Sequence, residues 1–265
     1  MKKVLSIAGS STSGGAGLQA DLKTYAHFGV YGLTAITTIV AQDPTDWSHR
    51  VFPIELDVLR AQLDTIFGGV GVDAVKTGML GSVELIHLVA EYIDKFKPKM
   101  VVVDPVIACK GADRVMNTDV ANALREIMVP RAFVLTPNLL EASILTGIDI
   151  KSTDDMQSAA KALHIMGAKH VVIKGGSRLG GSRAIDIYFD GKNFTRFEND
   201  IITPSQKLAF GNNHGAGCTF AASIAAQLAK GIDVAMAIKN ANTLVNAGIR
   251  NGFKLNEFVG CLNIL

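Results

Sequence analysis

The chain has 265 residues, 48% of them hydrophobic and 19% charged, and a formal net charge of +2 at pH 7. This composition predicts a globular protein with a large core, and the length fits a single domain spanning residues 1–265. The nearly balanced charge, without a basic block, argues against nucleic acid as a partner. Because no apolar run approaches the roughly 20 residues of a membrane-spanning helix, we expect no membrane association.

The cysteines and the first residues bear on where the protein works. Cys109, Cys218 and Cys261 lie far apart in the sequence and, being three, cannot all form disulfides. The apolar run at residues 4–8 is shorter than the roughly 7–15 residues of a signal-peptide core. Both features predict a reduced, cytoplasmic protein.

Short apolar runs alternate with helical patterns along most of the chain. Strands are predicted at residues 3–8, 33–40, 74–77, 100–104, 133–136 and 170–174. Helices are predicted at residues 15–28, 57–67, 83–96 and, as two long helices, within 218–250. Residues 183–197 contain Asp190-Gly191 between two alternating segments, which predicts a β-hairpin. The alternation predicts an α/β fold with a central, mostly parallel sheet flanked by helices on both faces.

Open α/β sheets bind ligands beyond the carboxyl ends of their strands, so the segments that follow the strands are candidate functional sites. They are residues 9–17 (GSSTSGGAG), 41–44 (AQDP), 76–80 (KTGML), 104–106 (DPV), 136–138 (TPN) and 174–176 (KGG). The first segment lacks the glycine spacing of a dinucleotide-binding loop and the Gly-Lys-Ser/Thr of a P-loop. It is either a tight turn or, as we favour, a loop of small residues against which a flat ligand lies.

A second glycine-rich turn precedes the first of the two long C-terminal helices. It consists of Gly215, Ala216 and Gly217. Backbone N–H groups and the helix dipole at such a turn favour a phosphate or a developing oxyanion. Lys174 could neutralise a phosphate, and Asp104 and Glu141 could hold Mg²⁺ together with water and phosphate oxygens. Asp104 could instead simply end a strand and Asn138 cap a helix, but together these residues favour phosphoryl transfer.

Six motifs together resemble a known family: AGSSTSGGAGLQADLKT, KTGML, VDPV, TPNLLEA, KGG and HGAGC. In this order, over nearly the whole chain, they resemble the hydroxymethylpyrimidine and pyridoxal kinase branch of the ribokinase superfamily. The segments IACKG, WSH and HGAGC further resemble the pyridoxal kinases of Gram-positive bacteria that also accept hydroxymethylpyrimidine. The resemblance implies a ribokinase-like homodimer that uses ATP and Mg²⁺. Its substrate would be the hydroxymethyl group of pyridoxal, of related B6 vitamers or of 4-amino-5-hydroxymethyl-2-methylpyrimidine.

The resemblance also implies roles for single residues. Cys218 stands where most ribokinase-like enzymes have a general-base aspartate, and its thiolate would form readily because a helix N-terminus lowers a thiol's pKa. Cys109, beside Lys110-Gly111 on a mobile lid, would close over the substrate. An aldehyde substrate could then form a hemithioacetal with one thiolate while the other assists proton removal. Cys218 could instead be a packed small residue and Cys109 a surface cysteine; Cys261, in the C-terminal tail, is expected to be inert. The implied metal ligands are Asp104 and Glu141. The implied nucleotide contacts are Asn138, Lys174, Gly176 and Gly217.

The resemblance also implies which residues contact the substrate. The implied substrate contacts are Gly9, Ser11, Gly17, Gln42, His49, Met79, Val106 and Cys109. Ser11 replaces an aspartate usual in relatives, which implies a changed substrate preference or affinity. Gln42 stands where hydroxymethylpyrimidine kinases have glutamine and pyridoxal-preferring relatives often have methionine, and an amide can pair with a pyrimidine. Met79 could equally be a core methionine, and His49 a surface histidine.

Three interpretations remain beside the dual kinase. Gln42 favours a dedicated hydroxymethylpyrimidine and phosphomethylpyrimidine kinase of thiamin biosynthesis, whereas the two cysteines favour pyridoxal. A weakly active relative that binds the phosphorylated vitamin is the second. A nicotinamide-dependent dehydrogenase is disfavoured, because the sequence lacks both the glycine spacing and the ribose-binding acid.

Overall fold

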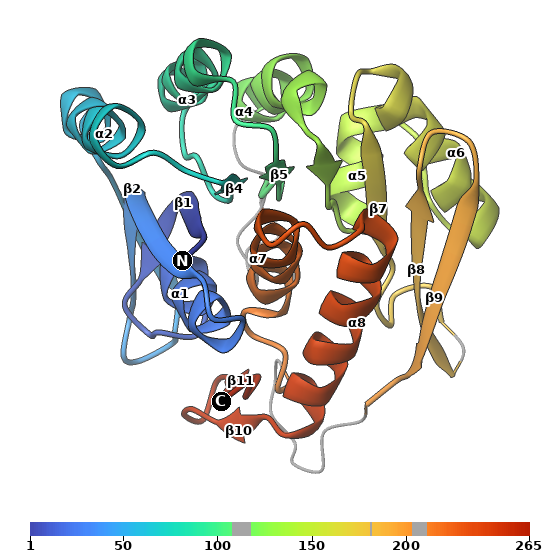
Figure 1. Ribbon diagram of the computed structural model, residues 1–265. Helices are drawn as coiled ribbons and strands as arrows, with labels where there is room; N and C mark the ends of the chain where they lie inside the picture. Colours follow the sequence, from blue (N-terminus) through green and yellow to red (C-terminus); the bar gives the residue numbers. More distant parts are fainter. Residues whose placement is uncertain (108–117, 181, 203–210) are drawn as a thin grey trace.

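The computed structural model describes residues 1–107, 118–180, 182–202 and 211–265 of the chain. The strands of the main sheet are β1 Lys3–Ser11, β2 Tyr31–Gln42, β3 His49–Pro53, β4 Ala74–Thr77, β5 Val101–Val103, β6 Val134–Leu135, β7 His170–Lys174, β8 Arg183–Phe189 and β9 Phe194–Asp200. Within the described ranges they form one sheet in the order β3-β2-β1-β4-β5-β6-β7-β8-β9 (Figure 1). The strands from β2 to β7 in this order are parallel, and β3, β8 and β9 add antiparallel edges. The predicted mostly parallel sheet and the β8–β9 hairpin are confirmed.

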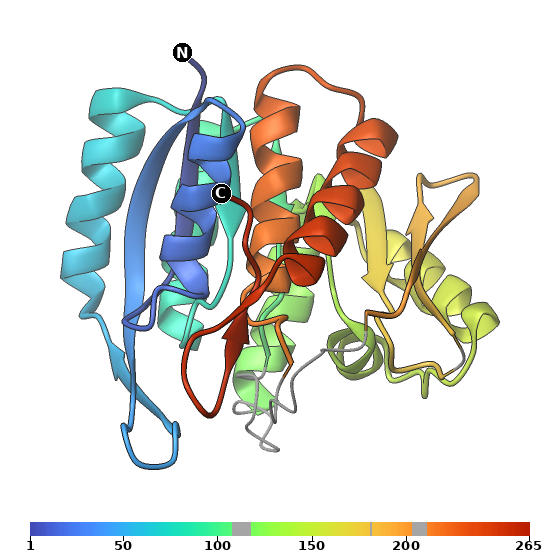
Figure 2. The same cartoon turned by 90° about the horizontal axis from the view of Figure 1, so that it is seen from below.

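Helices cover both faces of this sheet. They are α1 Gly17–His27, α2 Leu56–Leu63, α3 Val83–Phe96, α4 Thr118–Ala123, α5 Leu139–Thr146, α6 Thr153–Ile165, α7 Ala216–Ala229 and α8 Val234–Arg250. Helices α1, α7 and α8 lie on one face, seen from the front in Figure 2, and α2 to α6 lie on the other. Because successive strand residues point to opposite faces, Val102 packs in the layer of α7 while Val101 and Val103 pack in the other layer.

Helix α7 lies closest to the centre of the sheet (Figure 1). Every residue from Thr219 to Ala229 is buried, and most of them are alanine, serine or threonine. Small side chains let the helix axis approach the strands closely, and α7 contacts β1, β4 and β5. The N-terminus of α7 is therefore held at the carboxyl ends of these central strands.

Several boundaries differ from the sequence prediction. β2 continues to Gln42 and pairs with β3, an edge strand that was not predicted. Four of the five β3 residues are exposed, so the strand lacks the apolar alternation that reveals a strand in a sequence. Helix α1 begins at Gly17, two residues later than predicted, since Gly14 has a φ of 74° and keeps the chain in the turn. A small unpredicted sheet joins β10 Phe253–Lys254 to β11 Gly260–Cys261.

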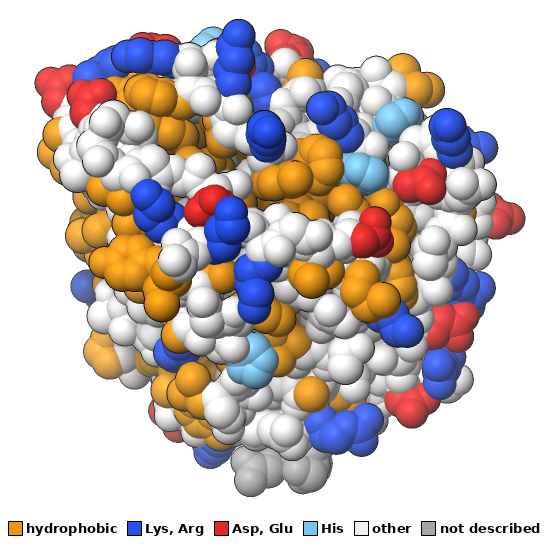
Figure 3. All heavy atoms as spheres, in the orientation of Figure 1, with side chains coloured by type: hydrophobic (Ala, Val, Ile, Leu, Met, Phe, Trp, Pro, Cys, Tyr) orange, Lys and Arg blue, Asp and Glu red, His pale blue; other side chains and the backbone are white. Residues whose placement is uncertain are grey.

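On the face drawn in Figure 3, basic and acidic side chains are interspersed with apolar ones. In the parts of the chain that the structure describes, no helix has both the length and the apolarity needed to cross a membrane.

Candidate active site

The carboxyl ends of the parallel strands meet at one edge of the sheet, beside the N-termini of α5 and α7. Two backbone hydrogen bonds fix the chain at the ends of β4, β5, β6 and β7. The N–H of Asp104 donates to the carbonyl of Thr77 over 3.0 Å, and the N–H of Lys174 donates to the carbonyl of Pro137 over 2.8 Å. The side chains that follow the strands therefore start from fixed positions.

Three charged side chains gather at this edge: Lys174, Asp104 and Glu141. Lys174 Nζ donates to Asp104 Oδ1 over 2.9 Å, with only 16% and 4% of the two side chains exposed. Burial raises the pKa of Glu141 to about 7, with Lys174 opposing and Asp104 adding to the shift. Burial also disfavours the Lys174 ammonium, but the carboxylates of Asp104 and Glu141 outweigh it and the pKa of Lys174 is raised. The result is a buried cation flanked by two carboxyl groups.

Asn138 and Glu141 are tied to each other at the start of α5. The Asn138 side chain accepts from the N–H of Glu141 at 3.0 Å, and Glu141 Oε2 accepts from the N–H of Asn138 at 2.8 Å. This reciprocal arrangement is a capping box. The side-chain oxygen of Asn138 thus caps α5, as the alternative interpretation expected. The same cap holds Glu141 beside Lys174.

The second glycine-rich turn lies where the sequence predicted it, at the N-terminus of α7. Gly215 has a φ of 89°, and a Cβ on it would overlap the carbonyl oxygen of Gly15. Gly217 differs: a Cβ there would lie 3.5 Å from Lys174 Nζ and 3.9 Å from Asp104 Oδ2. Gly215 is therefore required by contact between the two glycine-rich turns, whereas Gly217 leaves room beside the charged cluster. First-turn N–H groups of a helix have no partner within the helix, so this end can bind an anion.

Cys218 follows these glycines in the first turn of α7 and is half-buried. The expectation of a lowered thiol pKa is wrong. Burial raises the pKa of Cys218 to about 11; Lys76 lowers it, whereas Asp21 and Asp104 raise it further. The N–H of Gly17 favours the thiolate only weakly against this desolvation. At neutral pH the side chain is a thiol rather than a thiolate.

Four of the expected substrate residues lie together at the carboxyl ends of β1 and β2 and just beyond β4. A Cβ on Gly9 would lie 3.6 Å from Met79 Sδ and would press on Thr38. Gln42 Nε2 donates to Ser11 Oγ over 3.4 Å. Met79 is 9% exposed, so its side chain is mainly packed while its sulfur remains beside Gly9. The ends of β1 and β2, together with Met79, thus form one wall of a site.

The remaining expected substrate residues are more scattered. His49 stands opposite Gln42 in the β2–β3 pair, and burial lowers its pKa. Val106 is half-buried and its N–H donates to the carbonyl of Asp104. Gly17 is bridged to Ser10 at the end of β1, and its N–H donates to the sulfur of Cys218. Cys109, with the adjacent Lys110-Gly111, lies outside the described residues.

A sequence model of phosphomethylpyrimidine kinases matches residues 11–263. The chain belongs to this family. It is 51% identical over 263 residues to a pyridoxine kinase of Bacillus subtilis, covering 98% of this chain and 94% of that protein. It is 41% identical to a hydroxymethylpyrimidine/phosphomethylpyrimidine kinase of the same organism, covering 98% and 94%.

Solved structures of the family have the same fold. A Bacillus subtilis pyridoxal kinase in complex with ADP matches with a TM-score of 0.93 and 50% identity over 99% of this chain and 97% of that one. A Staphylococcus aureus pyridoxal kinase in complex with AMP-PCP and pyridoxal matches with a TM-score of 0.92 and 42% identity over 100% and 93%. The family resemblance and the fold expected from it are confirmed.

In this member of the family, a buried ion pair that the sequence patterns did not predict lies beneath the site. Lys76 Nζ on β4 donates to Asp21 Oδ2 on α1 over 2.9 Å, and both side chains are fully buried. The other Asp21 oxygen has no hydrogen-bond partner among the described residues. Lys76 Nζ lies 2.9 Å from where a Cβ on Gly78 would be, in the KTGML loop. A lysine within a short strand covered on both faces is the signal that would have revealed this pair.

A second missed group supports the Lys174-Gly175-Gly176 turn. Asp186 Oδ1 accepts from the N–H of Gly175 at 3.0 Å, and Asn242 Nδ2 donates to Asp186 Oδ2 over 2.8 Å. A Cβ on Gly175 would overlap the carbonyl of Ile185, whereas Gly176 has a φ of 53° and open space around it. The turn after β7 is thereby fixed from behind, with Gly176 at its open side.

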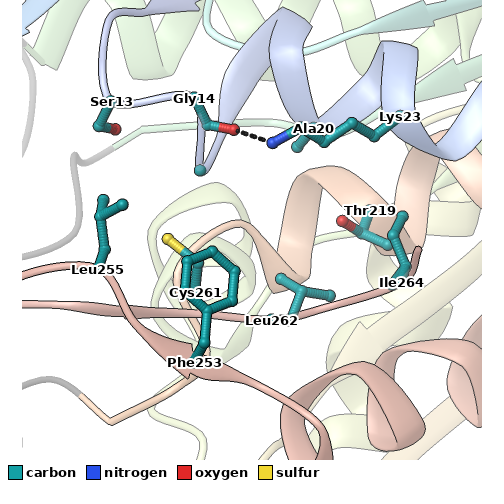
Figure 4. Close-up of a pocket in the computed structure, with 11 residues that line it drawn as sticks. Ser13, Gly14, Ala20, Lys23, Thr219, Phe253, Leu255, Cys261, Leu262 and Ile264 are labelled. Carbon is teal, nitrogen blue, oxygen red and sulfur yellow. Dashed lines mark hydrogen bonds between the residues drawn. The ribbon is translucent and has the colours of Figure 1, made fainter.

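A cavity of about 140 Å³ lies behind the first glycine-rich loop (Figure 4). Along one side of it Lys23 Nζ donates to the carbonyl of Gly14 over 2.9 Å, and Phe253 and Leu255 of the C-terminal segment line the opposite side. Cys261, expected in an isolated tail, instead lies buried in β11 and lines this cavity. Among the described residues that line it, none belongs to the charged cluster, so the cavity is separate from that cluster.

Proposed function

We propose that this chain is an ATP-dependent kinase that phosphorylates the hydroxymethyl group of pyridoxal and related B6 vitamers. The observation that carries the proposal is the Lys174–Asp104 pair beside Gly217 at the N-terminus of α7. A cation and a helix N-terminus at one point suit a transferring phosphoryl group, for which positioning and charge stabilisation supply most of the catalysis. Its family and its pyridoxine kinase relative support the same activity.

The residues present fit Mg²⁺ as the accompanying ion. Asp104 and Glu141 offer carboxylate oxygens beside the phosphate position, and Mg²⁺ prefers few protein ligands with water and phosphate oxygens completing the set. Over the residues described, no group of three or more His, Cys, Asp or Glu side chains could hold a metal by itself, which fits this shared coordination. When bound, Mg²⁺ neutralises phosphate charge; Lys174 and the N–H groups of α7 orient the γ-phosphate.

The role of Cys218 follows from its raised pKa. A thiol with a pKa of about 11 holds its proton at neutral pH and cannot accept one from the substrate hydroxyl. In the state described, Cys218 is therefore protonated, and a role as general base would require bound ligands to lower its pKa. Capture of an aldehyde by Cys109 remains part of the proposal, without a structural account.

Hydroxymethylpyrimidine is the second candidate substrate, because a specific contact favours it. Gln42 Nε2 lies 3.4 Å from Ser11 Oγ, so the amide is held at the substrate wall beside Gly9. An amide in this position offers a donor and an acceptor to an aminopyrimidine edge. The relative that phosphorylates this pyrimidine supports the same assignment.

We also propose a cytoplasmic homodimer. Apolar side chains of β2, β3 and α2 are exposed on neighbouring elements: Ile39, Phe52 and Val58. Such a patch beside an open sheet edge suits a second copy of the chain. Light scattering is expected to give twice the chain mass, and Phe52→Asp is expected to give a monomer. A monomeric wild type would contradict the proposal.

The test of function is ADP release with Mg²⁺ and ATP. Pyridoxal, pyridoxine and hydroxymethylpyrimidine are offered separately to the wild type and to Cys109→Ala. Loss of pyridoxal turnover alone in the variant would support the thiol–aldehyde step, whereas turnover of the pyrimidine alone would assign the enzyme to the second candidate. Tight binding of a vitamer without ADP release from any of the three would refute the kinase.

A further inference from the structure

The tip of the β2–β3 hairpin carries Trp47, the one tryptophan of the chain. Its φ is 61°, in the left-handed region that an aromatic residue rarely adopts. The tip holds this conformation through its own hydrogen bonds: the N–H of Trp47 donates to the carbonyl of Asp43 over 2.9 Å, and the N–H of Ser48 donates to Asp46 Oδ1 over 2.8 Å. A residue kept in an unfavourable conformation by its surroundings points to a functional constraint on where the side chain goes.

The indole ring lies on Phe258, more than 200 residues away in the sequence. The ring centroids are 6.2 Å apart and the planes differ by 15°, which is a stacked pair. Phe258 belongs to the turn between β10 and β11, where Asn256 Oδ1 accepts from the N–H groups of Phe258 and Val259 at 3.0 Å each. Figure 2 shows the blue tip of the hairpin and the dark red C-terminal turn projecting on the same side of the molecule.

Each ring is connected to a different half of the site. On the hairpin side, Gln42 and His49 form the last pair of the β2–β3 ladder, and Gln42 reaches Ser11. On the other side, the N–H of His214 donates to the carbonyl of Gly260 over 3.1 Å. β11 is thus bonded directly to the turn that precedes α7. The stacked rings thus complete a continuous series of contacts from the substrate wall to the phosphate-binding turn.

We infer that Trp47 and Phe258 are positioning residues that set the distance between the heterocycle wall and the phosphate-binding turn. The inference rests on the proposed function, because it assigns the heterocycle wall to the vitamer and the phosphate-binding turn to ATP. Misplacing reacting groups by about 1 Å can cost on the order of 100-fold in rate. Loss of either ring therefore lowers kcat and raises KM for the heterocycle. KM for ATP changes little, since Lys174 and α7 remain in place.

The kinetic test is a double-mutant cycle. Trp47→Ala and Phe258→Ala are each expected to lower kcat/KM for the heterocycle by roughly 10-fold or more. The double variant should be no worse than either single one, because the two rings act as a pair. Trp47→Phe, which keeps a ring, should recover most of the activity. The matched control is Phe253→Ala, which removes an aromatic ring that is 49% exposed in the same segment.

Tryptophan fluorescence distinguishes a positioning role of the two rings from a role in stability alone. Because Trp47 is the single tryptophan, its emission reports the stack directly. Hydroxymethylpyrimidine is expected to change the emission saturably in the wild type and in Phe253→Ala, but not in Phe258→Ala. Wild-type turnover with multiplicative losses in the double variant, or with losses only in thermal stability, would overturn the inference. Absence of turnover in the wild type would instead refute the proposed function.

Discussion

Replacing Lys76 with methionine removes one partner of a fully buried ion pair while nearly keeping its volume. Lys76 Nζ and Asp21 Oδ2 are 2.9 Å apart, and neither side chain is exposed to solvent. Removing one partner of such a pair costs about 3–5 kcal/mol, because it leaves an uncompensated buried charge. The midpoint temperature of thermal unfolding should therefore fall by roughly 6–20 °C, at about 2–4 °C per kcal/mol for a protein of this size class.

The pH dependence follows from the remaining carboxyl group. Burial already raises the pKa of Asp21, and without Lys76 the opposing attraction is lost, so the pKa rises further. A group whose pKa is raised in the folded state stabilises the fold below its unfolded pKa, and this stability is lost as pH rises through the folded pKa. The deficit of Lys76→Met against wild type should thus shrink between pH 7.5 and pH 5.

Two further variants make the reasoning refutable. Lys76→Met combined with Asp21→Asn leaves no buried charge and should recover at least half of the lost stability. Lys2→Met breaks the exposed pair with Asp73, whose charged atoms are 2.8 Å apart, and should cost at most about 1 kcal/mol. A single Lys76→Met variant within about 1 kcal/mol of wild type, or a double variant less stable than the single one, would contradict the argument.

Three other predictions concern the site itself. Gly215→Ala should be markedly less stable in thermal unfolding than Gly176→Ala, because only the former meets the carbonyl of Gly15 in addition to a positive φ; equal losses would contradict this. Lys174→Met should lower kcat by on the order of 100-fold with an unchanged circular dichroism spectrum, and near-normal turnover would remove it from the phosphate site. Alkylation of Cys218 by iodoacetamide, followed by mass spectrometry, should be slow at pH 7 and still rising above pH 9, since burial raises its pKa to about 11; a plateau below pH 8 would show a thiolate.

The regular elements of the centre were predictable because each satisfies a local rule. β4, α3 and β7 begin and end at the predicted residues, since their apolar patterns end abruptly at polar or glycine residues. β3 and the β10–β11 pair were not, because β3 and β10 are short and exposed and β11 has only two residues, so no apolar periodicity marks them. Sequence periodicity registers burial over several residues, and none of these strands offers it.

The candidate site was predictable where it follows the topology of the sheet. Strand ends converge, so Asp104 and Lys174 could be expected near each other, and the structure places them 2.9 Å apart. Desolvation is different, because it depends on what covers a group from every side. The predicted lowering of the Cys218 pKa was wrong for this reason, and the buried partners Lys76 and Asp21 were missed for the same reason.

The local charge balance explains why a thiol is compatible with position 218. Lys76 is matched by Asp21 and Lys174 by Asp104, which leaves Glu141 as an additional carboxyl group with a pKa raised to about 7. An aspartate at 218, implied by resemblance for most ribokinase-like enzymes, would add another carboxylate beside Asp21 and Asp104, and like charges at short range disfavour ionisation. A neutral thiol adds no charge until ligands arrive. Phosphates and their cation would then change the balance together, so the protonation of Cys218 should depend on which substrates are bound.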